Sequence, residues 1–176
     1  MKRVVVDTNV VLVANGSHAD ASPDCVTECI DRLESLKKRG KVVIDDRYRI
    51  LGEYLNKTLP NRSRGFGDAF VKWLLQNQAN PRRVEQVALT ERAPEVFDEF
   101  PDAALQTRID RSDRKFLATA AAHPGRPAVW QASDCKWLDW WQPLKVSGVT
   151  VEFLCPDDVC RVYAKKFPRR PVPPLP

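Results

Sequence analysis

The stretch VVVDTN at residues 4–9 decides the fold, because a run of valines ends there in an acid, Asp7. Three consecutive valines predict a short buried strand. Further strands are expected at 42–44, 128–131 and 149–154, and patterns typical of helices lie between them. Strands that alternate with helices indicate a parallel sheet with right-handed crossovers. Open sheets of this kind bind ligands at the carboxyl ends of their strands.

Start and stop residues predict the helices that lie between the strands. Ser22-Pro23 fits the cap and first turn of a helix that Gly40 ends. A second helix carries Ile50 on its apolar side and ends before Pro60. Further helices are expected over 110–122 and 156–166, with a short helical turn over 135–141.

Residues 61–109 break this alternation, and one amphipathic helix and a strand at 84–89 are expected there. We therefore expect a three-layer α/β/α fold with a central parallel sheet. One domain would cover residues 1–166, with 61–109 as an elaborated segment. Residues 167–176 form a tail rich in proline and arginine, which is expected to be extended and mobile.

Four acids occupy positions that such a fold brings to one edge: Asp7, Glu53, Asp113 and Asp134. Asp7 and Asp134 follow predicted strands, whereas Glu53 and Asp113 border the apolar sides of predicted helices. Carboxylates gathered in this way repel one another unless a cation neutralises them. Oxygen ligands select Mg²⁺ or Mn²⁺, so the set predicts a divalent metal site.

Three of these acids also have a plainer interpretation, whereas none is found for Asp7. Glu53 could face solvent, Asp113 could favour a helix N-terminus, and Asp134 could cap the next helix. Asp110 and Asp139 are further acids that could join the group, and Asp110 could instead cap the helix over 110–122.

The composition excludes several other classes of protein. Five cysteines, no CxxC pair and only two histidines argue against a zinc site and favour reduced thiols. No apolar stretch approaches the ~20 residues of a membrane span, and the first residues do not resemble a secretory signal. We therefore expect a cytoplasmic protein without membrane association.

The net charge of +5 permits nucleic-acid binding without proving it. Arg111, Arg114 and Lys115 flank Asp113, while Arg62 and Arg64 lie in a stretch that contains glycine. These residues could hold backbone phosphates, and the alternative is a solvated charged face.

Four segments together resemble the PIN-domain nuclease family. VVVDTNVVL at 4–12 is similar to the opening strand of that family, and RILGEYLNK at 49–57 to the helix with its second acid. DRKFLATA at 113–120 resembles the helix with its third acid, and ASD at 132–134 the element after the next strand. The segments follow the family's order through most of residues 1–158, which would make 1–166 a PIN-like nuclease domain.

The resemblance implies Mg²⁺- or Mn²⁺-dependent hydrolysis of phosphodiester bonds, usually in RNA. Asp7, Glu53, Asp113 and Asp134 would hold one or two ions that activate a water and stabilise the leaving oxygen. Thr8 and Asn9 could orient Asp7 or contact phosphate, and Arg111 and Arg114 could bind the substrate backbone. The expected partners are RNA, an antitoxin protein if the chain is a toxin, and a second copy of the chain if it forms a homodimer.

Three other functions stay open. A PIN-like nuclease could act on DNA or on structured junctions, and a degenerate PIN module could bind RNA or protein without cleavage. The intact set of four acids argues against the degenerate module. A phosphatase of the haloacid-dehalogenase type also has an Asp after a strand, but it needs a second Asp where this chain has Asn9.

Overall fold

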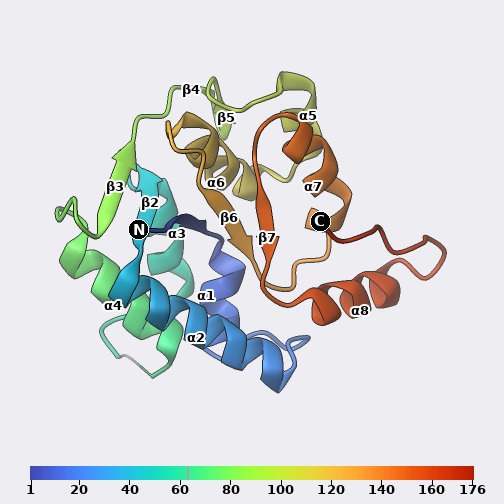
Figure 1. Ribbon diagram of the computed structural model, residues 1–176, viewed down its shortest axis with the longest axis horizontal. Helices are drawn as coiled ribbons and strands as arrows, with labels where there is room; N and C mark the ends of the chain where they lie inside the picture. The colour runs from blue at the N-terminus through green and yellow to red at the C-terminus, as the bar shows by residue number, and fades with distance from the viewer. Residues whose placement is uncertain (63) are drawn as a thin grey trace.

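The computed structural model describes residues 1–62 and 64–176, and its centre is a five-stranded parallel sheet (Figure 1). The strand order is β3-β2-β1-β6-β7, and every neighbouring pair is parallel. The strands are β1 (Arg3–Val6), β2 (Lys41–Asp45), β3 (Val84–Val87), β6 (Ala128–Gln131) and β7 (Val151–Phe153).

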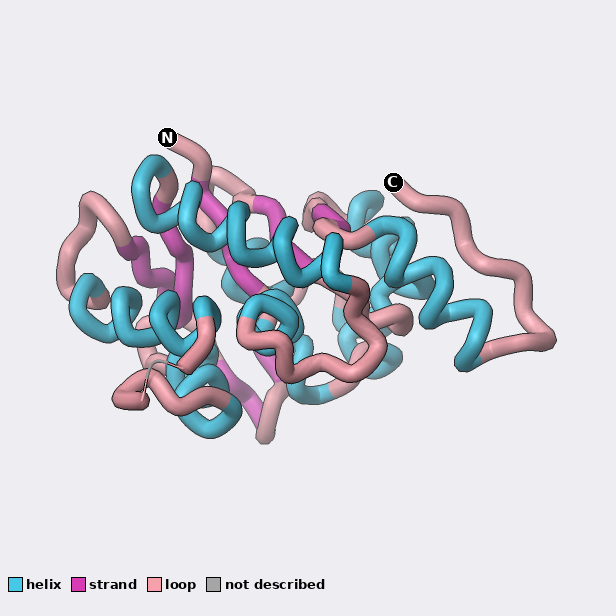
Figure 2. Tube along the Cα trace, turned by 90° about the horizontal axis from the view of Figure 1, so that it is seen from below, coloured by secondary structure: helices cyan, strands magenta, loops and turns pink. Residues whose placement is uncertain are grey.

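Helices cover both faces of this sheet (Figures 1 and 2). The chain steps from β1 to β2 to β3 in one direction, returns to β6 beyond β1, and then steps to β7. Because parallel crossovers are right-handed, this reversal sends the helices of the β3–β6 and β6–β7 connections to the opposite face. The helices before β3 pack on one another, and α6 packs on β1, β2 and β6. The helices are α1 (Thr8–Ala14), α2 (Pro23–Arg39), α3 (Arg49–Lys57), α4 (Phe66–Asn77), α5 (Ala103–Arg108), α6 (Arg111–Ala122), α7 (Trp137–Val146) and α8 (Pro156–Lys166).

The predicted fold class is confirmed, and the valine stretch is its centre. Val4, Val5 and Val6 are fully buried, because β1 has a strand on each side and helices on both faces. A strand covered on both faces is apolar throughout instead of alternating. The predicted caps of α2 are also present, since the Ser22 hydroxyl accepts a hydrogen bond from the Cys25 amide and Gly40 follows the last turn.

The segment 61–109 contributes more to the sheet than the expected elaboration. Its predicted strand is β3, an edge strand of the central sheet. The remainder contains a small hairpin that the sequence does not predict, formed by β4 (Glu91–Ala93) and β5 (Val96–Phe97), followed by the short helix α5. The predicted turn at 135–141 is also longer than expected, because α7 continues through Pro143 to Val146.

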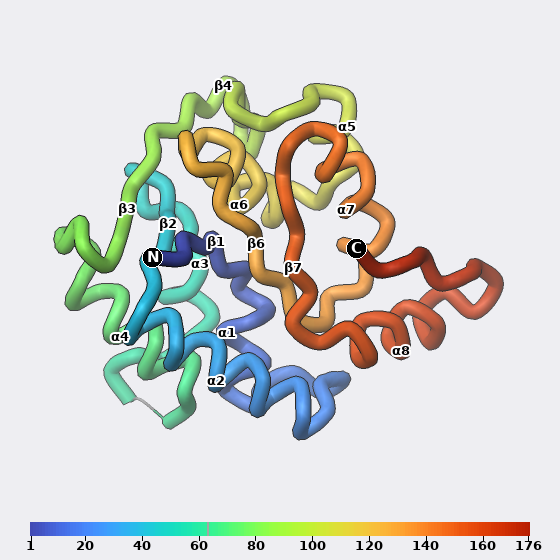
Figure 3. The backbone as a smooth tube through the Cα atoms, in the orientation of Figure 1, coloured from blue at the N-terminus to red at the C-terminus, as the bar shows by residue number. Residues whose placement is uncertain are grey.

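The C-terminal tail is extended, as predicted, and it runs back from the end of α8 to finish near α7 (Figure 3). Two contacts hold it there. The Trp141 indole donates a hydrogen bond to the Pro174 carbonyl at 2.9 Å, and Arg170 pairs with Asp139 at 3.0 Å. The expected mobility is therefore opposed by specific contacts at both ends of the tail.

The expectation of five reduced thiols is wrong for one pair, because a disulfide joins Cys25 to Cys155. These residues are 130 positions apart, and they meet only because α8 begins beside the first turn of α2. Sequence spacing does not reveal a contact of that kind. Cys29, Cys135 and Cys160 are free. Among the described residues, no helix is long and apolar enough to cross a membrane.

Candidate metal centre

Asp7 and Asp134 lie at the ends of two neighbouring strands. Asp7 follows β1 directly, and its amide donates a hydrogen bond to the Trp130 carbonyl of β6 at 3.0 Å. Asp134 lies in the loop after β6, and its amide donates to the Gln131 side chain at 3.1 Å. Asp7 is also the N-cap of α1, where its Oδ1 accepts the Asn9 amide at 2.6 Å. Strand pairing therefore sets the relative position of these two acids.

Asn9 joins the two loops through its side chain. Its Oδ1 accepts a hydrogen bond from the Ser133 amide at 2.8 Å, which fixes the residue that precedes Asp134. Of the two roles that the sequence left open for Asn9, this contact supports orientation. It positions the loop after β6 as well as Asp7.

Glu53 reaches the same edge from α3. Thr8 at the start of α1 donates its hydroxyl to Glu53 Oε1 at 2.7 Å, and Lys115 Nζ lies 2.5 Å from Glu53 Oε2. The next residue, Tyr54, donates its buried hydroxyl to the Val6 carbonyl. These contacts anchor α3 to the end of β1, so Thr8 also has an orienting role.

Asp113 completes the group from the first turn of α6. Burial, followed by the charges of Asp134, Asp110 and Glu53, raises the pKa of Asp113 to about 7, and Lys115 opposes this shift. Burial and the charge of Asp113 raise the pKa of Asp7 well above its usual value, with smaller contributions from Asp134 and Glu53. The hydrogen bond from the Asn9 amide opposes that rise. The structure thus brings all four predicted acids within electrostatic reach of one another.

The group fits a hard divalent cation. Its donors are carboxylate oxygens, and a cation would offset both the burial of Asp7 and Asp113 and the charges of the neighbouring acids, which together raise the pKa values of these two residues. The group is open: among the described residues, no three of these acids have oxygens that all lie within 4.8 Å of one another. A tighter trio consists of Cys25, Cys29 and Cys155, but sulfur suits softer metals and two of these residues form the disulfide.

Two further acids named from the sequence have other partners. Asp110 forms an ion pair with Lys136 across the edge of the site. Asp139 accepts the Tyr163 hydroxyl at 2.8 Å and pairs with Arg170. The carboxylate of Asp139 is therefore engaged with α8 and the tail, and its role as a further ligand stays a prediction.

The structure corrects most of the expected phosphate contacts. Arg114 is buried, and its guanidinium donates to the Ile109 and Glu95 carbonyls. It therefore holds the backbone before α6 and is not free for substrate. Lys115 is buried in its pair with Glu53. Arg111 is exposed in the first turn of α6, so its role as a phosphate ligand stays a prediction.

Arg62 and Arg64 lie away from the acids. Their loop leads into α4, where Gly65 and Gly67 pack against Asn15 at the end of α1 that is opposite Asp7. The glycines allow this close approach of two helices and do not form a phosphate loop.

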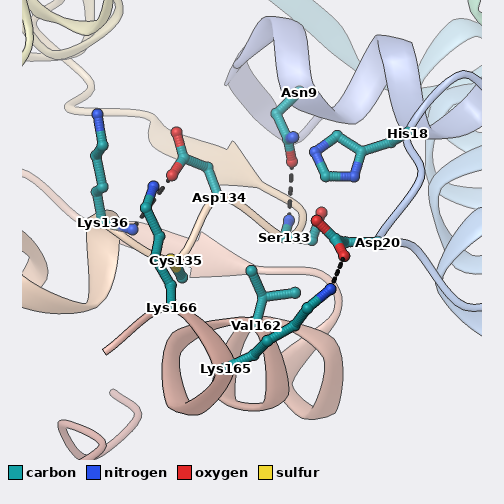
Figure 4. A pocket seen from close by; sticks show the side chains of 10 residues that line it. All are labelled: Asn9, His18, Asp20, Ser133, Asp134, Cys135, Lys136, Val162, Lys165 and Lys166. Atoms are coloured by element: carbon teal, nitrogen blue, oxygen red, sulfur yellow. Dashed lines mark hydrogen bonds and ion pairs between the residues drawn. The ribbon is translucent and has the colours of Figure 1, made fainter. Parts of the chain in front are cut away.

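Two hollows flank the four acids. One has a volume of about 520 Å³ and includes Glu53, Arg49, Lys57 and Lys115 in its lining. The other, of about 530 Å³, includes Asp134 and three lysines, of which one directly precedes α7 and two lie in α8 (Figure 4). Sequence reasoning missed those lysines, which are Lys136, Lys165 and Lys166. The only available signal was the pair Lys165-Lys166 at the end of the last predicted helix.

Comparison with known proteins assigns no family: no protein-family model matches the chain, and no curated protein or solved structure matches it.

Proposed function

We propose that this protein is a metal-dependent phosphodiesterase that cleaves nucleic acid, with RNA as the first substrate to test. The observation that carries the proposal is the convergence of Asp7, Glu53, Asp113 and Asp134 at one edge, with the pKa values of Asp7 and Asp113 raised by burial and mutual repulsion. The resemblance of the four sequence segments to PIN-domain nucleases supports the same function.

Asp7, Asp113 and Asp134 would hold Mg²⁺ or Mn²⁺, with Glu53 at the rim. When bound, the ion supplies charge stabilisation and a water of lowered pKa. Asn9 fixes both Asp7 and the loop of Asp134, while Thr8 and Lys115 fix Glu53. Because the pKa of Asp113 is about 7, protonation competes with cation binding near neutral pH, and metal affinity should rise with pH.

The substrate and partners belong to the same proposal. A cytoplasmic location is part of the proposal, because RNA is present there. In that reducing compartment the Cys25–Cys155 disulfide would form mainly under oxidising conditions. A toxin role would add an antitoxin partner, and a neighbouring reading frame for a small protein would support it. DNA cleavage is the main alternative, whereas the intact acids count against a module that only binds.

The first prediction tests the site directly. Purified protein should cleave labelled RNA with Mg²⁺ or Mn²⁺ and stop when chelator is added. Asp7→Asn and Asp113→Asn should each reduce cleavage by at least about a hundredfold, because each removes a carboxylate from the centre of the group. Asp31→Asn is the matched control, since Asp31 lies exposed on α2.

The assay should include single-stranded and duplex DNA beside RNA. Cleavage of DNA alone would replace the RNA substrate and keep the chemistry. Undiminished cleavage by Asp7→Asn or Asp113→Asn would exclude this site as the active site.

A further inference from the structure

The hollow beside Asp134 carries more positive than negative groups. It lies between α1, the loop after β6 and the last turn of α8, and Figure 4 shows Lys166 extending from α8 toward Asp134 in that loop while Lys165 extends toward Asp20. Its charged and ionisable lining residues are Asp20, Asp134, His18, Lys136, Lys165 and Lys166.

The lysines of this hollow differ in their partners. Lys165 pairs with Asp20 at 3.1 Å, and Lys136 pairs with Asp110. Lys166 forms no ion pair with any residue that the structure describes; its ammonium lies 5.8 Å from the centroid of the Phe167 ring and reaches toward the side of the hollow that holds Asp134 (Figure 4). Lys166 therefore has a positive charge to offer to a ligand.

His18 adds an unused polar group on the wall across from α8. Its Nδ1 is buried and has no hydrogen-bond partner among the described parts of the chain. The ring itself is only partly buried and lines the hollow, so a ligand there would reach it through its other nitrogen, Nε2. His18 and Lys166 come from opposite walls of the same hollow (Figure 4).

These groups select an anion with several oxygen atoms. A phosphate offers both negative charge for an ammonium and acceptor oxygens for a ring N–H. The position of the hollow indicates which kind of phosphate would bind, because Asp134 both lines the hollow and belongs to the acid group. A phosphate held here belongs to a chain whose next phosphate can lie at the acids.

We propose that the hollow beside Asp134 binds a backbone phosphate of the substrate strand, adjacent to the one that is cleaved, with Lys166 and His18 as its ligands. The inference rests on the proposed function in placing the cleaved bond at the acid group. The hollow beside Glu53, with Arg49 and Lys57, lies on the other flank of the acids. The nucleic-acid strand would pass from one hollow to the other, across the edge of the sheet where the β-strands have their carboxyl ends.

The test is binding of labelled single-stranded RNA by the Asp7→Asn protein, titrated against salt. Lys166→Ala should lower the log–log salt slope by about 0.7, the value for one phosphate contact on a single strand, and weaken binding roughly fivefold at 0.1 M salt. Unrelated RNA sequences should show the same loss, because phosphate contacts carry no sequence information. Lys166→Arg should restore the slope.

Lys38→Ala is the matched control, since it removes one lysine from the exposed end of α2, which leads into the start of β2 at the opposite edge of the sheet. Unchanged salt slopes in Lys166→Ala and in the double variant with Lys165→Ala would overturn the phosphate site. Cleavage by the wild-type protein is measured separately. If the wild-type protein cleaves RNA but the variants have unchanged salt slopes, the proposed function stands and the phosphate site is overturned. If the variants have altered salt slopes but the wild-type protein does not cleave, the phosphate site stands and the proposed function is overturned.

Discussion

At the scale of single residues, the acids were predictable and their cationic neighbours were not. Asp7 and Asp134 follow strands, and Asp113 lies on the apolar side of α6, so pattern alone locates them. Lys115 and Arg114 are adjacent to Asp113 in sequence and suggested phosphate ligands. The fold instead turns Lys115 to Glu53 and Arg114 to backbone carbonyls. Which partner a long side chain reaches depends on tertiary contacts that no local pattern contains.

The pKa of Asp113 leads to a prediction for the protein in chelator. This pKa rises from 3.8 in the unfolded chain to about 7 in the folded protein. Between these values the folded state holds more protons, so the contribution of Asp113 to the free energy of unfolding falls as pH rises from about 4 to about 7. Asp113→Asn removes this penalty and should be roughly 2–4 kcal/mol more stable than wild type at pH 8, with little difference near pH 4.

Urea denaturation in EDTA at both pH values measures the effect. Asp31→Asn should show no such pH-dependent gain. If the gain from Asp113→Asn is equal at pH 4 and pH 8, Asp113 is not held in a repulsive group.

At the scale of helices and strands, the predicted elements agree with the structure where the local sequence signals are strong. The bounds of β6 and α8 match their expected ranges, and α2 begins and ends at its predicted caps. The β4–β5 hairpin and α5 were missed because they are short and lack a sustained apolar period. The helix α7 is longer than the predicted turn because it continues through Pro143, although proline usually ends a helix.

The packing of α4 on α1 gives a second prediction. A Cβ at Gly67 would lie 2.1 Å from the Val11 carbonyl oxygen, so Gly67→Ala forces the two helices apart. The variant should lose about 1–3 kcal/mol of stability, although alanine itself favours helix by about 1 kcal/mol. Gly52→Ala in α3 is the control, because a Cβ there meets nothing within 4 Å and should stabilise the protein. Equal effects of both changes in urea denaturation would contradict this packing.

At the scale of the whole molecule, alternation of strands and helices predicted a parallel sheet but did not place every element in it. The strand at 84–89 belongs to the central sheet as β3, although its surroundings read as an elaboration. The Cys25–Cys155 disulfide was missed for a related reason. It depends on where α8 begins relative to α2, which is a property of the complete fold.

The disulfide gives a prediction on stability. It closes a loop with a sequence separation of 130. Loop entropy puts its contribution at about 5 kcal/mol, with about 2–4 kcal/mol as the usual measured range. Dithiothreitol should therefore lower the urea midpoint of the wild-type protein and have no such effect on Cys25→Ser. Cys160→Ser, which removes a free cysteine, should respond to dithiothreitol as wild type does. An unchanged wild-type midpoint would show that the bridge does not stabilise the fold.

The central position of β1 has a consequence for synthesis of the protein. β1 is the first strand to leave the ribosome, yet one of its two neighbours, β6, pairs Ala128 with Val4. One edge of this valine-rich strand therefore stays open while more than two thirds of the chain is made, on the order of ten seconds. An open apolar edge is a site for aggregation. Nascent chains that stall before β6 should depend on chaperones, and only completion of β6 allows the N-terminal helices and their acids to assume the final arrangement.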